Sequence, residues 1–556
     1  MQTVGVSTDV LVVGGGTAGC LAAMRASETG ADVAVIEKGG SISRSGSCAS
    51  GMDHYSVLLD EAPWDTPEGY LASLSAEKAK PQDLKVAEVY ARNSKKVFQY
   101  LENIGMPFKD KVTGKYQRIA GLGGNHPRTV SFEGAAFKPI LARQVHRLQA
   151  RVLERVAVQG LLTESGRVIG AVGFHIRSGD FFVIKAKAVV ITTGGAVRFY
   201  PAPSGHNFIT HTPPFNTGDG QAMAFRAGAA LTNMEFTSTS AEPKGFSAPG
   251  LTGFVSCGAR LVNAKGEYFM KRYHPLAEHG PRHLLVKAIK VEADEGRGPC
   301  YFDCRHLPPN KIEFLLRGFR NEKVTLIDLF AAQGIDLTRD LVPFEPREFD
   351  CNGNGIVIDE TCRSSLEGLF SAGNCSSASL ALPGACTLGY IAGEKAAEEA
   401  SRVKTQPPPG REQIAEYREA IFRPLDSRGG LHPTELEDAL RQVMHEFVGF
   451  ERNAEGLRTA LERLNGLREK SRDLTAHNMH ELLRANEARN LIEVSLLIAA
   501  GTLRRASTQA TPWDTTSYRA ADKKQKGGFI LITASGDKGA TLGPPSDWKY
   551  REAPAT

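Results

Sequence analysis

DVLVVGGGTAGCLAAMRASETGADVAVIE, residues Asp9 to Glu37, sets the architecture of the whole chain. An apolar run ends in three glycines, a helical pattern follows, and a second apolar run ends in Glu37. This order of strand, glycine turn, helix and strand is typical of dinucleotide-binding folds, in which a pyrophosphate lies at the helix N-terminus. Gly14 permits the tight turn, Gly16 lets the backbone approach the pyrophosphate, and Gly19 lets helix and strand pack closely. Glu37 ends the second strand, where an acidic side chain accepts hydrogen bonds from a ribose.

The composition is typical of a soluble globular protein. Of the 556 residues, 41% are hydrophobic and 23% are charged, and a formal net charge of +5 predicts no nucleic-acid partner. No apolar run reaches the roughly 18 residues of a membrane span, and the first strand begins too near Met1 for a signal peptide. The nine scattered cysteines favour a reduced, cytoplasmic setting. The spacing of Cys300 and Cys304, with no second pair nearby, predicts no metal site.

The pattern along the chain predicts an α/β nucleotide-binding domain in two pieces. We expect a helix over 138–153, then a small antiparallel sheet, because the apolar period changes to two. The order of strands, glycine turns and helices that marks the nucleotide-binding domain is lost after the helical pattern that follows NTGDG. It returns at GIVID. The predicted divisions are the nucleotide-binding domain (1–234 and 346–402), an inserted domain (235–345), a helical domain (403–510) and a polar tail (511–556) with one strand at Gly528 to Ala534.

Three separated segments match a known family. They are GGGTAG with Glu37, TTGG before NTGDG, and GIVID followed by GLFSAGN. Over roughly residues 8–402 the chain resembles the flavoproteins of the fumarate reductase and succinate dehydrogenase superfamily, which includes the α subunit of adenylylsulfate reductase. The resemblance implies a Rossmann-like FAD-binding domain with an inserted capping domain and a C-terminal helical domain. By position, the residues that would hold FAD are Gly14, Gly16, Thr17, Ala18, Gly19, Glu37, Lys38, Arg44, Ser45, Gly46, Ser47, Gly194, Gly195, Asp219, Gly373, Asn374, Thr387 and Leu388.

The positions at which the chain differs from this family bear on how FAD is attached and on which substrates are expected. Succinate dehydrogenases link FAD covalently to a histidine in an Arg-Ser-His segment, and Gly46 stands at that position, so we expect non-covalent FAD. Dicarboxylate enzymes use an arginine in a glycine-rich segment as proton donor and substrate clamp. Here ungapped alignment puts Val255 at that place, and a gap would put Arg260 there. The histidine before the GGI turn and the arginine before the last FAD helix are also absent, because the chain reads EFDCNGNGI and SLALPGAC. A dicarboxylate without charged partners would be poorly held.

The segments EKGGSISRSGSCASG, TTGGAVRFY and NAKGEYFM make the chain most similar in character to the adenylylsulfate reductase α branch. However, the pocket histidine of that branch falls at about Ser379, and an aromatic position becomes Phe215. We therefore expect a neutral, weakly acidic or aromatic substrate, such as a hydroxylated aromatic compound, a quinol or an enoate.

The resemblance implies an FAD-dependent oxidoreductase that transfers a hydride between flavin N5 and a small organic substrate. Candidate proton donors and acceptors, all on loops near the expected flavin segments, are His126, Arg128, Tyr200, His211 and Arg260. With no clustered cysteine motif in this chain, the adenylylsulfate reductase-like character implies a heterodimer with a ferredoxin-like iron–sulfur subunit. The alternatives are an oxygen-using flavoprotein oxidase, an adenylylsulfate reductase-like or fumarate reductase-like enzyme proper, an electron-transfer flavoprotein subunit without its own substrate, and a flavin-binding homologue without activity.

Overall fold

The computed structural model describes the chain except for residues 77–82, 121–125, 203, 209, 211, 248–249, 323, 352, 379, 428, 509–527, 535–548 and 555–556. His211 and Ser379, both named above from the sequence, lie outside the described residues. A seven-stranded sheet forms the centre of the molecule, with the strand order β6-β2-β1-β9-β8-β7 and with β16 also paired to β9. These strands are β1 (Thr3–Val13), β2 (Val33–Glu37), β6 (Arg151–Glu154), β7 (Val156–Glu164), β8 (Arg167–His175), β9 (Phe181–Ile191) and β16 (Leu369–Ser371).

Strand β9 has both parallel and antiparallel neighbours. It runs parallel to β1 along its length, while its first half pairs antiparallel with β8 and its last residues pair parallel with β16. The apolar run of β1 from Val10 to Val13 is almost fully buried, as a parallel strand covered on both faces requires. Parallel strands end at one edge of the sheet, so the turns after β1 and β9 lie together there. The hydrogen bond from Thr192 N to the Val13 carbonyl, 2.8 Å long, joins these two turns directly.

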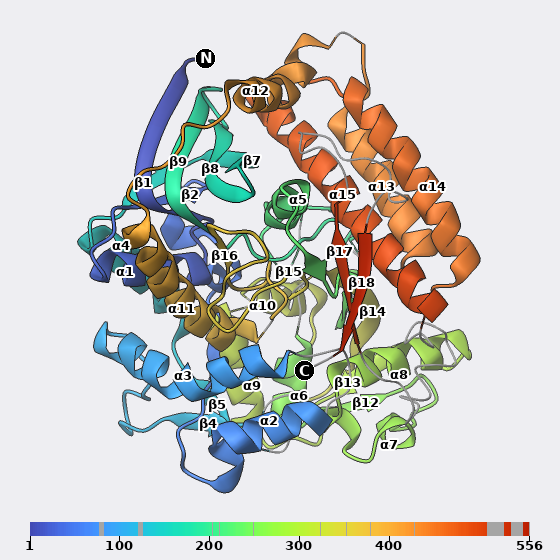
Figure 1. Ribbon diagram of the computed structural model, residues 1–556. Coiled ribbons are helices and arrows are strands. Elements are labelled where there is room, and N and C mark those ends of the chain that lie inside the picture. The colour runs from blue at the N-terminus through green and yellow to red at the C-terminus, as the bar shows by residue number, and fades with distance from the viewer. Residues whose placement is uncertain are drawn as a thin grey trace.

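Helices cover the sheet, and the molecule extends from it in two directions (Figure 1). The helices of this region are α1 (Thr17–Glu28), α2 (Pro67–Ala76), α3 (Leu84–Asn103), α4 (Phe137–Arg147), α5 (Asp219–Arg226) and α11 (Ala381–Arg402). The 3-10 turns η1 (Ile42–Arg44), η2 (Ser47–Ser50), η3 (Pro63–Asp65) and η4 (Gly134–Ala136) lie between them. A small sheet with the order β3-β5-β4 accompanies α2 and α3 and consists of β3 (His54–Ser56), β4 (Gln117–Ile119) and β5 (Thr129–Ser131).

Residues 238–350 contain a sheet and a hydrophobic core of their own. The strand order is β11-β14-β13-β12, and the aromatic side chains of Phe254, Phe302 and Phe344 pack together at its centre. The elements are β11 (Ser238–Pro243), α6 (Leu251–Cys257), β12 (Arg260–Val262), α7 (Met270–Tyr273), η5 (Ala277–His279), α8 (Arg282–Asp294), β13 (Cys300–Asp303), α9 (Pro309–Glu322), α10 (Val324–Gln333) and β14 (Val342–Asp350). We refer to this unit as the cap.

Four helices form the other extension, at the upper right of Figure 1. They are α12 (Arg411–Asp426), α13 (Pro433–Phe447), α14 (Ala454–Lys470) and α15 (Met479–Thr508), with η6 (Ser471–Asp473) before the last. Leucines at helical spacing on α13 and α14 pack on α15, whose inner face also covers α5. A further sheet, β15-β10-β17-β18, joins β10 (Leu231–Thr232) and β15 (Gly355–Ile356) to β17 (Gly528–Thr533) and β18 (Lys549–Pro554). None of the helices in the described part of the chain is long and apolar enough to cross a membrane.

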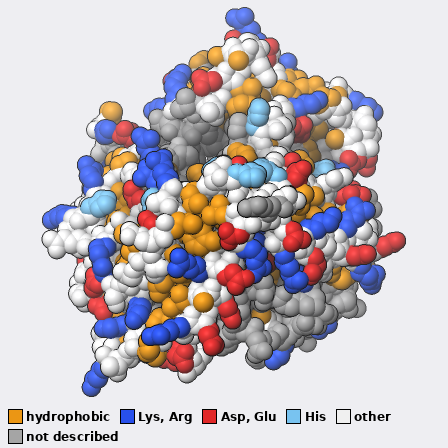
Figure 2. Space-filling model, turned by 90° about the horizontal axis from the view of Figure 1, so that it is seen from above, with side chains coloured by type: hydrophobic (Ala, Val, Ile, Leu, Met, Phe, Trp, Pro, Cys, Tyr) orange, Lys and Arg blue, Asp and Glu red, His pale blue; other side chains and the backbone are white. Residues whose placement is uncertain are grey.

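The expected fold class, an α/β flavoprotein fold with a C-terminal helical domain, is confirmed, and so is the strand in the tail. The helix expected over 138–153 is wrong in its second half, because α4 ends at Arg147 and Arg151–Glu154 form β6. Gln149 has a φ of +60°, which turns the chain so that β6 pairs with β2. Figure 2 shows that positive and negative side chains are interspersed with apolar groups on the face seen from above.

Candidate active site

The turn after β1 needs glycine at two positions for different reasons. Gly14 has a φ of +103°, and a Cβ on it would lie 2.6 Å from the Thr192 carbonyl oxygen. A Cβ on Gly19 would overlap the carbonyl oxygen of Gly14, so α1 can pack on the turn only with glycine there. Gly16 is the N-cap of α1, and its Cβ position has only Gly46 Cα within 4 Å, at 3.8 Å. The first N–H groups of α1 therefore face backbone and small residues, as an approaching phosphate requires.

The Glu37 carboxylate holds the glycine turn and the following segment together. Oε2 accepts hydrogen bonds from the Gly15 backbone N at 2.7 Å and from Ser45 Oγ at 2.7 Å, while Oε1 accepts from Gly39 N at 2.6 Å. This buried carboxylate therefore holds the loop in place. The hydrogen bond to the ribose of FAD that we expect from it stays a prediction.

The segment Arg44–Ser47 crosses the N-terminus of α1. Gly46 has a φ of +76°, and a Cβ on it would lie 3.0 Å from Gly16 Cα. Ser45 is buried and Arg44 is exposed. The small residues of this segment thus allow its backbone to approach the glycine turn, and a side chain as large as histidine at position 46 would need a different backbone conformation.

Helices α1 and α11 pack backbone to backbone. A Cβ on Gly389 would lie 2.5 Å from the Ala18 carbonyl oxygen, and a Cβ on Gly393 would overlap the carbonyl oxygen of Ala22. The two helices run in the same direction, and α11 begins about seven residues, or about 10 Å, before the level at which α1 begins. Gly373, with a φ of +77°, lies against Ala18. Two helix N-termini therefore open toward the same edge of the sheet, one after the other.

The predicted contacts on α11 and its preceding loop are placed as follows. Thr387 and Leu388 are fully buried within the helix packing, and the Asn374 carbonyl oxygen accepts a 2.9 Å hydrogen bond from Gly353 N. In the turn after β9, Gly194 has a φ of +79°, and a Cβ there would lie 2.9 Å from Asn216 Nδ2, while Gly195 is buried.

Lys38 and Asp219 form a buried ionic contact. Lys38 Nζ donates to Asp219 Oδ2 at 2.7 Å, to Glu487 Oε1 at 3.0 Å and to Thr217 Oγ1 at 3.0 Å. Burial lowers the pKa of the Lys38 ammonium, but the two carboxylates outweigh it and raise the pKa above its usual value. This contact ties the end of β2 to the start of α5 and to α15, so these two predicted cofactor residues at least position the surrounding elements.

The residues at this edge fit an FAD molecule. Gly14, Gly16, Gly46 and Gly373 supply backbone that can approach a flat or extended ligand closely. Within the described residues, the buried hydroxyl of Thr17, the first residue of α1, has no hydrogen-bond partner. A phosphate oxygen at the helix N-terminus would accept from it.

Comparison with known proteins also indicates an FAD-binding protein. The FAD binding domain family matches residues 9–384, and the fumarate reductase flavoprotein C-terminal family matches residues 437–509. The chain belongs to the FAD-binding flavoproteins of the fumarate reductase superfamily. It is 27% identical over 534 residues to a subunit of the fumarate reductase (CoM/CoB) of Methanothermobacter marburgensis, covering 90% of this chain and 93% of that protein. It is 28% identical over 543 residues to L-aspartate oxidase of Streptomyces coelicolor, covering 91% and 88%. Adenylylsulfate reductase from Archaeoglobus fulgidus has the same fold, with a TM-score of 0.87, 24% identity and coverage of 100% and 96%. The protein is an FAD-dependent oxidoreductase.

Of the four candidate proton donors that lie in the described part of the chain, only His126 and Arg128 lie together. The His126 ring stacks on Trp64 with centroids 5.0 Å apart, and Arg128 Nε donates to the Trp64 carbonyl at 2.9 Å. Tyr200 is 4% exposed, and its hydroxyl donates to the Val448 carbonyl at 3.0 Å. Burial raises the pKa of Tyr200 to about 12, so its phenol stays protonated at neutral pH.

Arg260 lies on the cap and is exposed, with its guanidinium 3.7 Å from the centre of the Tyr268 ring. All nine cysteines are buried. The described residues hold no group of three or more His, Cys, Asp or Glu side chains that could bind a metal ion.

A carboxylate–imidazole pair that the sequence did not predict lies near the cap. His54 Nδ1 contacts Asp53 Oδ1, and both residues directly follow the small-residue segment at residues 41–52. The Asp53 side chain is 6% exposed and that of His54 is 31% exposed. A Cβ on Gly318 would lie 3.8 Å from Asp53 Oδ2, so helix α9 of the cap approaches this pair. Nothing in the local sequence pattern distinguishes His54 from the other histidines of the chain, because its surroundings depend on contacts with distant segments.

A buried lysine beneath the glycine turn was also missed. Lys138 is 1% exposed, and its Nζ donates to the Gly15 carbonyl at 2.7 Å and to Cys20 Sγ at 3.2 Å. No ion pair joins this ammonium to a carboxylate of the described residues. The helical phase could have indicated it, because Lys138 shares a face of α4 with the buried Leu141 and Val145.

Proposed function

We propose that the protein transfers a hydride between flavin N5 and a small organic substrate without paired carboxylates, such as a hydroxylated aromatic compound, held between the flavin and the cap. This proposal rests on the two cap residues that could take the place of the arginine of dicarboxylate enzymes. Val255, which aligns with the catalytic arginine of dicarboxylate enzymes, is 1% exposed among apolar side chains. Arg260, the other candidate for that role, is exposed and stacked on Tyr268.

FAD, when bound, would supply the hydride acceptor or donor, and the chain would supply its binding and the proton chemistry. The N–H groups at the start of α1 would bind the pyrophosphate, and Glu37 would accept from the adenosine ribose. The N-terminus of α11 would face the flavin N1/C2=O edge, where its partial positive charge favours a negative group. Gly46 in place of a histidine supports non-covalent attachment.

His54 is the strongest candidate for the proton transfer that must accompany oxidation of a hydroxyl-bearing substrate, because the O–H hydrogen leaves as a proton. Its Nδ1 lies within ion-pair distance of the Asp53 carboxylate, which leaves Nε2 to take or give a proton. Helix α9 of the cap lies close to Asp53, so the pair is placed where the cap meets the flavin domain. We assign His54 the role of acid or base, with Asp53 orienting it.

Anaerobic reduction of the isolated protein's flavin by a library of quinols, hydroxylated aromatics, enoates and dicarboxylates would test this proposal. We expect bleaching by a hydroxylated aromatic compound and none by succinate, and steady turnover of succinate or fumarate would contradict the proposal. The variant His54→Gln should slow bleaching and change its pH profile while leaving flavin content unchanged. His146→Gln, on an exposed position of α4, is the matched control.

We further propose that the reduced flavin passes its electrons to a separate, ferredoxin-like iron–sulfur subunit. The Methanothermobacter relative is named as one subunit of its enzyme, and the described residues of this chain offer no metal site of their own. Co-expression with neighbouring genes followed by native mass measurement would test this. A lone chain that turns over rapidly with oxygen and binds no cluster protein would contradict it. A flavin that no substrate reduces would instead favour an electron-transfer subunit.

A further inference from the structure

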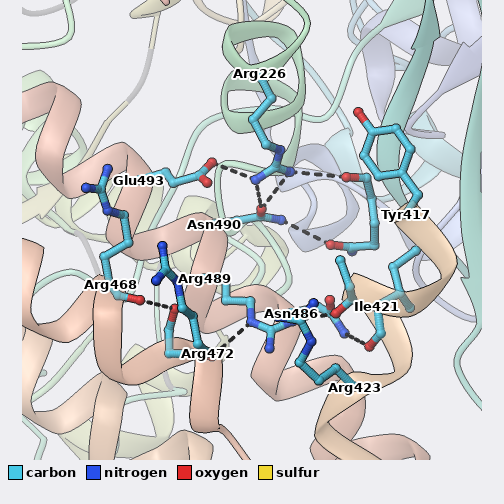
Figure 3. A pocket seen from close by; sticks show the side chains of 13 residues that line it. Arg226, Tyr417, Ile421, Arg423, Arg468, Arg472, Asn486, Arg489, Asn490 and Glu493 are labelled. Carbon is cyan, nitrogen blue, oxygen red and sulfur yellow. Dashed lines mark hydrogen bonds and ion pairs between the residues drawn. The ribbon is translucent and has the colours of Figure 1, made fainter. Parts of the chain in front are cut away.

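A cavity of about 80 Å³ lies at the seam between the helical domain and the central sheet, away from the glycine turn. Its wall combines side chains of α5, α12, α14, α15 and β7 (Figure 3). Five arginines line it, namely Arg226, Arg423, Arg468, Arg472 and Arg489, and the lining contains one carboxylate, that of Glu493. The cavity is therefore strongly basic, although the chain as a whole is nearly neutral.

Neighbouring carboxylates pair with some of these arginines but not with Arg489. Glu493 pairs with Arg226 at 2.6 Å, and outside the lining Glu419 pairs with Arg423 and Glu469 with Arg472. No carboxylate of the described residues lies within ion-pair distance of Arg489. Its guanidinium donates only to two backbone carbonyl oxygens, those of Ser471 at 3.2 Å and Ala420 at 2.6 Å. Arg489 therefore has no carboxylate in direct contact among the described residues, and Glu493 of the wall acts on it only from beyond ion-pair distance.

Two further donors in the wall have no acceptor in the described residues. They are Nε of Arg226 and Nε2 of Gln159, in side chains that are buried at 7% and 5% exposure. Leaving a buried donor unsatisfied costs about 1–3 kcal/mol, so their presence at one cavity calls for an acceptor there. Burial lowers the pKa of Arg489, repulsion from Arg423 and Arg226 lowers it further, and Glu493 raises it in part, which leaves the pKa at about 10. An anion in the cavity would offset this repulsion.

We propose that this cavity is a binding site for a small tetrahedral oxyanion, of the size of phosphate or sulfate. Arg489 and Arg226 hold the oxyanion from the floor, Gln159 donates from β7, and Arg423 closes the site from α12. The site is connected to the FAD region through Asn490. Its Oδ1 accepts from Arg226 at 3.0 Å, and its Nδ2 donates to Asp219 at 2.8 Å. Asn490 therefore links the site on α15 to α5, whose first residue, Asp219, is the partner of Lys38.

Isothermal titration of the flavin-loaded protein with inorganic phosphate, at constant ionic strength in chloride, tests the proposal. Sulfate is titrated in a second arm. We expect saturable binding at one site, which Arg489→Gln weakens by at least about tenfold. Arg423→Gln, on the accessible rim, should also weaken it, and this variant guards against misfolding of the first. Arg458→Gln, at an exposed position of α14, is the matched control and should bind as the unchanged protein does.

Two outcomes would overturn the site. One is the absence of saturable binding of either oxyanion beyond the effect of chloride. The other is equal affinity in the unchanged protein, Arg489→Gln and Arg423→Gln, which would place the bound oxyanion elsewhere, for instance near the flavin. Unequal affinities for phosphate and sulfate would identify which of the two the site prefers.

Discussion

Replacing Lys138 with methionine separates a role in flavin binding from a role in folding. The ammonium group is buried, and it donates to the carbonyl of Gly15. Gly15 and its neighbour Gly16 belong to the loop that we expect to bind the pyrophosphate. A buried charge without a carboxylate partner is costly, and a pyrophosphate would supply the missing negative charge. Met has a similar length and removes the charge with little loss of volume.

The expected magnitude follows from Coulomb's law. The ammonium lies one peptide group behind the loop, so a phosphate charge would be about 6 Å away, and the attraction at an effective dielectric constant of about 20 is about 3 kcal/mol. We expect the Kd for FAD to rise about a hundredfold in Lys138→Met. In the flavin-free protein the lost hydrogen bond and the removed buried charge oppose each other, so the free energy of unfolding should change by only about 1 kcal/mol.

Two measurements on the same preparations distinguish a role of Lys138 in flavin binding from a role in folding. Fluorescence titration of the flavin-free protein with FAD gives the Kd, and urea unfolding of the same protein gives its stability. Lys115→Met, at an exposed position, should change neither. An unchanged Kd in Lys138→Met would refute the reasoning, and a loss of stability as large as the loss of binding free energy would show that Lys138 serves folding instead.

Three other changes have clear expected outcomes. Acid precipitation should release the flavin into the supernatant, since Gly46 offers no side chain for a covalent link, and flavin retained in the pellet would contradict this. Glu37→Ala should lower flavin retention and, at about 1–3 kcal/mol for each buried group left unsatisfied, the unfolding free energy measured in urea; full flavin occupancy would count against the assignment. Burial raises the pKa of Glu487, but Lys38, Arg198 and their neighbours outweigh it and bring it to about 2. Because the folded pKa lies below the unfolded one, this stability is present above about pH 4.5 and is lost as pH falls toward 2, by about 3 kcal/mol in all. Unfolding free energies of Glu487→Gln measured between these pH values should therefore decline less steeply than those of the unchanged protein, and parallel curves would refute this.

The sequence predicted the parts of the fold that depend on local pattern. The elements between Asp9 and Glu37 were predictable because apolar runs, a glycine turn and a helical period follow one another without a break. The end of α4 was not, because the chain from Leu148 to Ala150 turns only to let β6 pair with β2, a contact between distant segments. Tyr200 was a plausible proton donor by its place after the TTGGA turn, but α13 and the following residues bury it. Lys138 and His54 were overlooked for the converse reason, since their chemistry arises from what packs against them.

The buried ionic contacts show how the helical domain bears on the flavin site. Glu437 of α13 is fully buried, and its carboxylate accepts from Arg198 and from Arg441, each at 2.7 Å, as well as from Arg484. Arg198 continues the chain of charges to Glu487, which bonds Lys38 at the end of β2. Pairs of this kind add little net stability, because desolvation offsets their attraction, but the loss of one partner leaves an uncompensated charge that costs about 3–5 kcal/mol. The contacts therefore permit one relative placement of α13, α15 and the central sheet and penalise others. That placement fixes Lys38 and Asp219 beside the glycine turn, so side chains that are more than 400 residues apart in sequence determine the geometry in which FAD would be held.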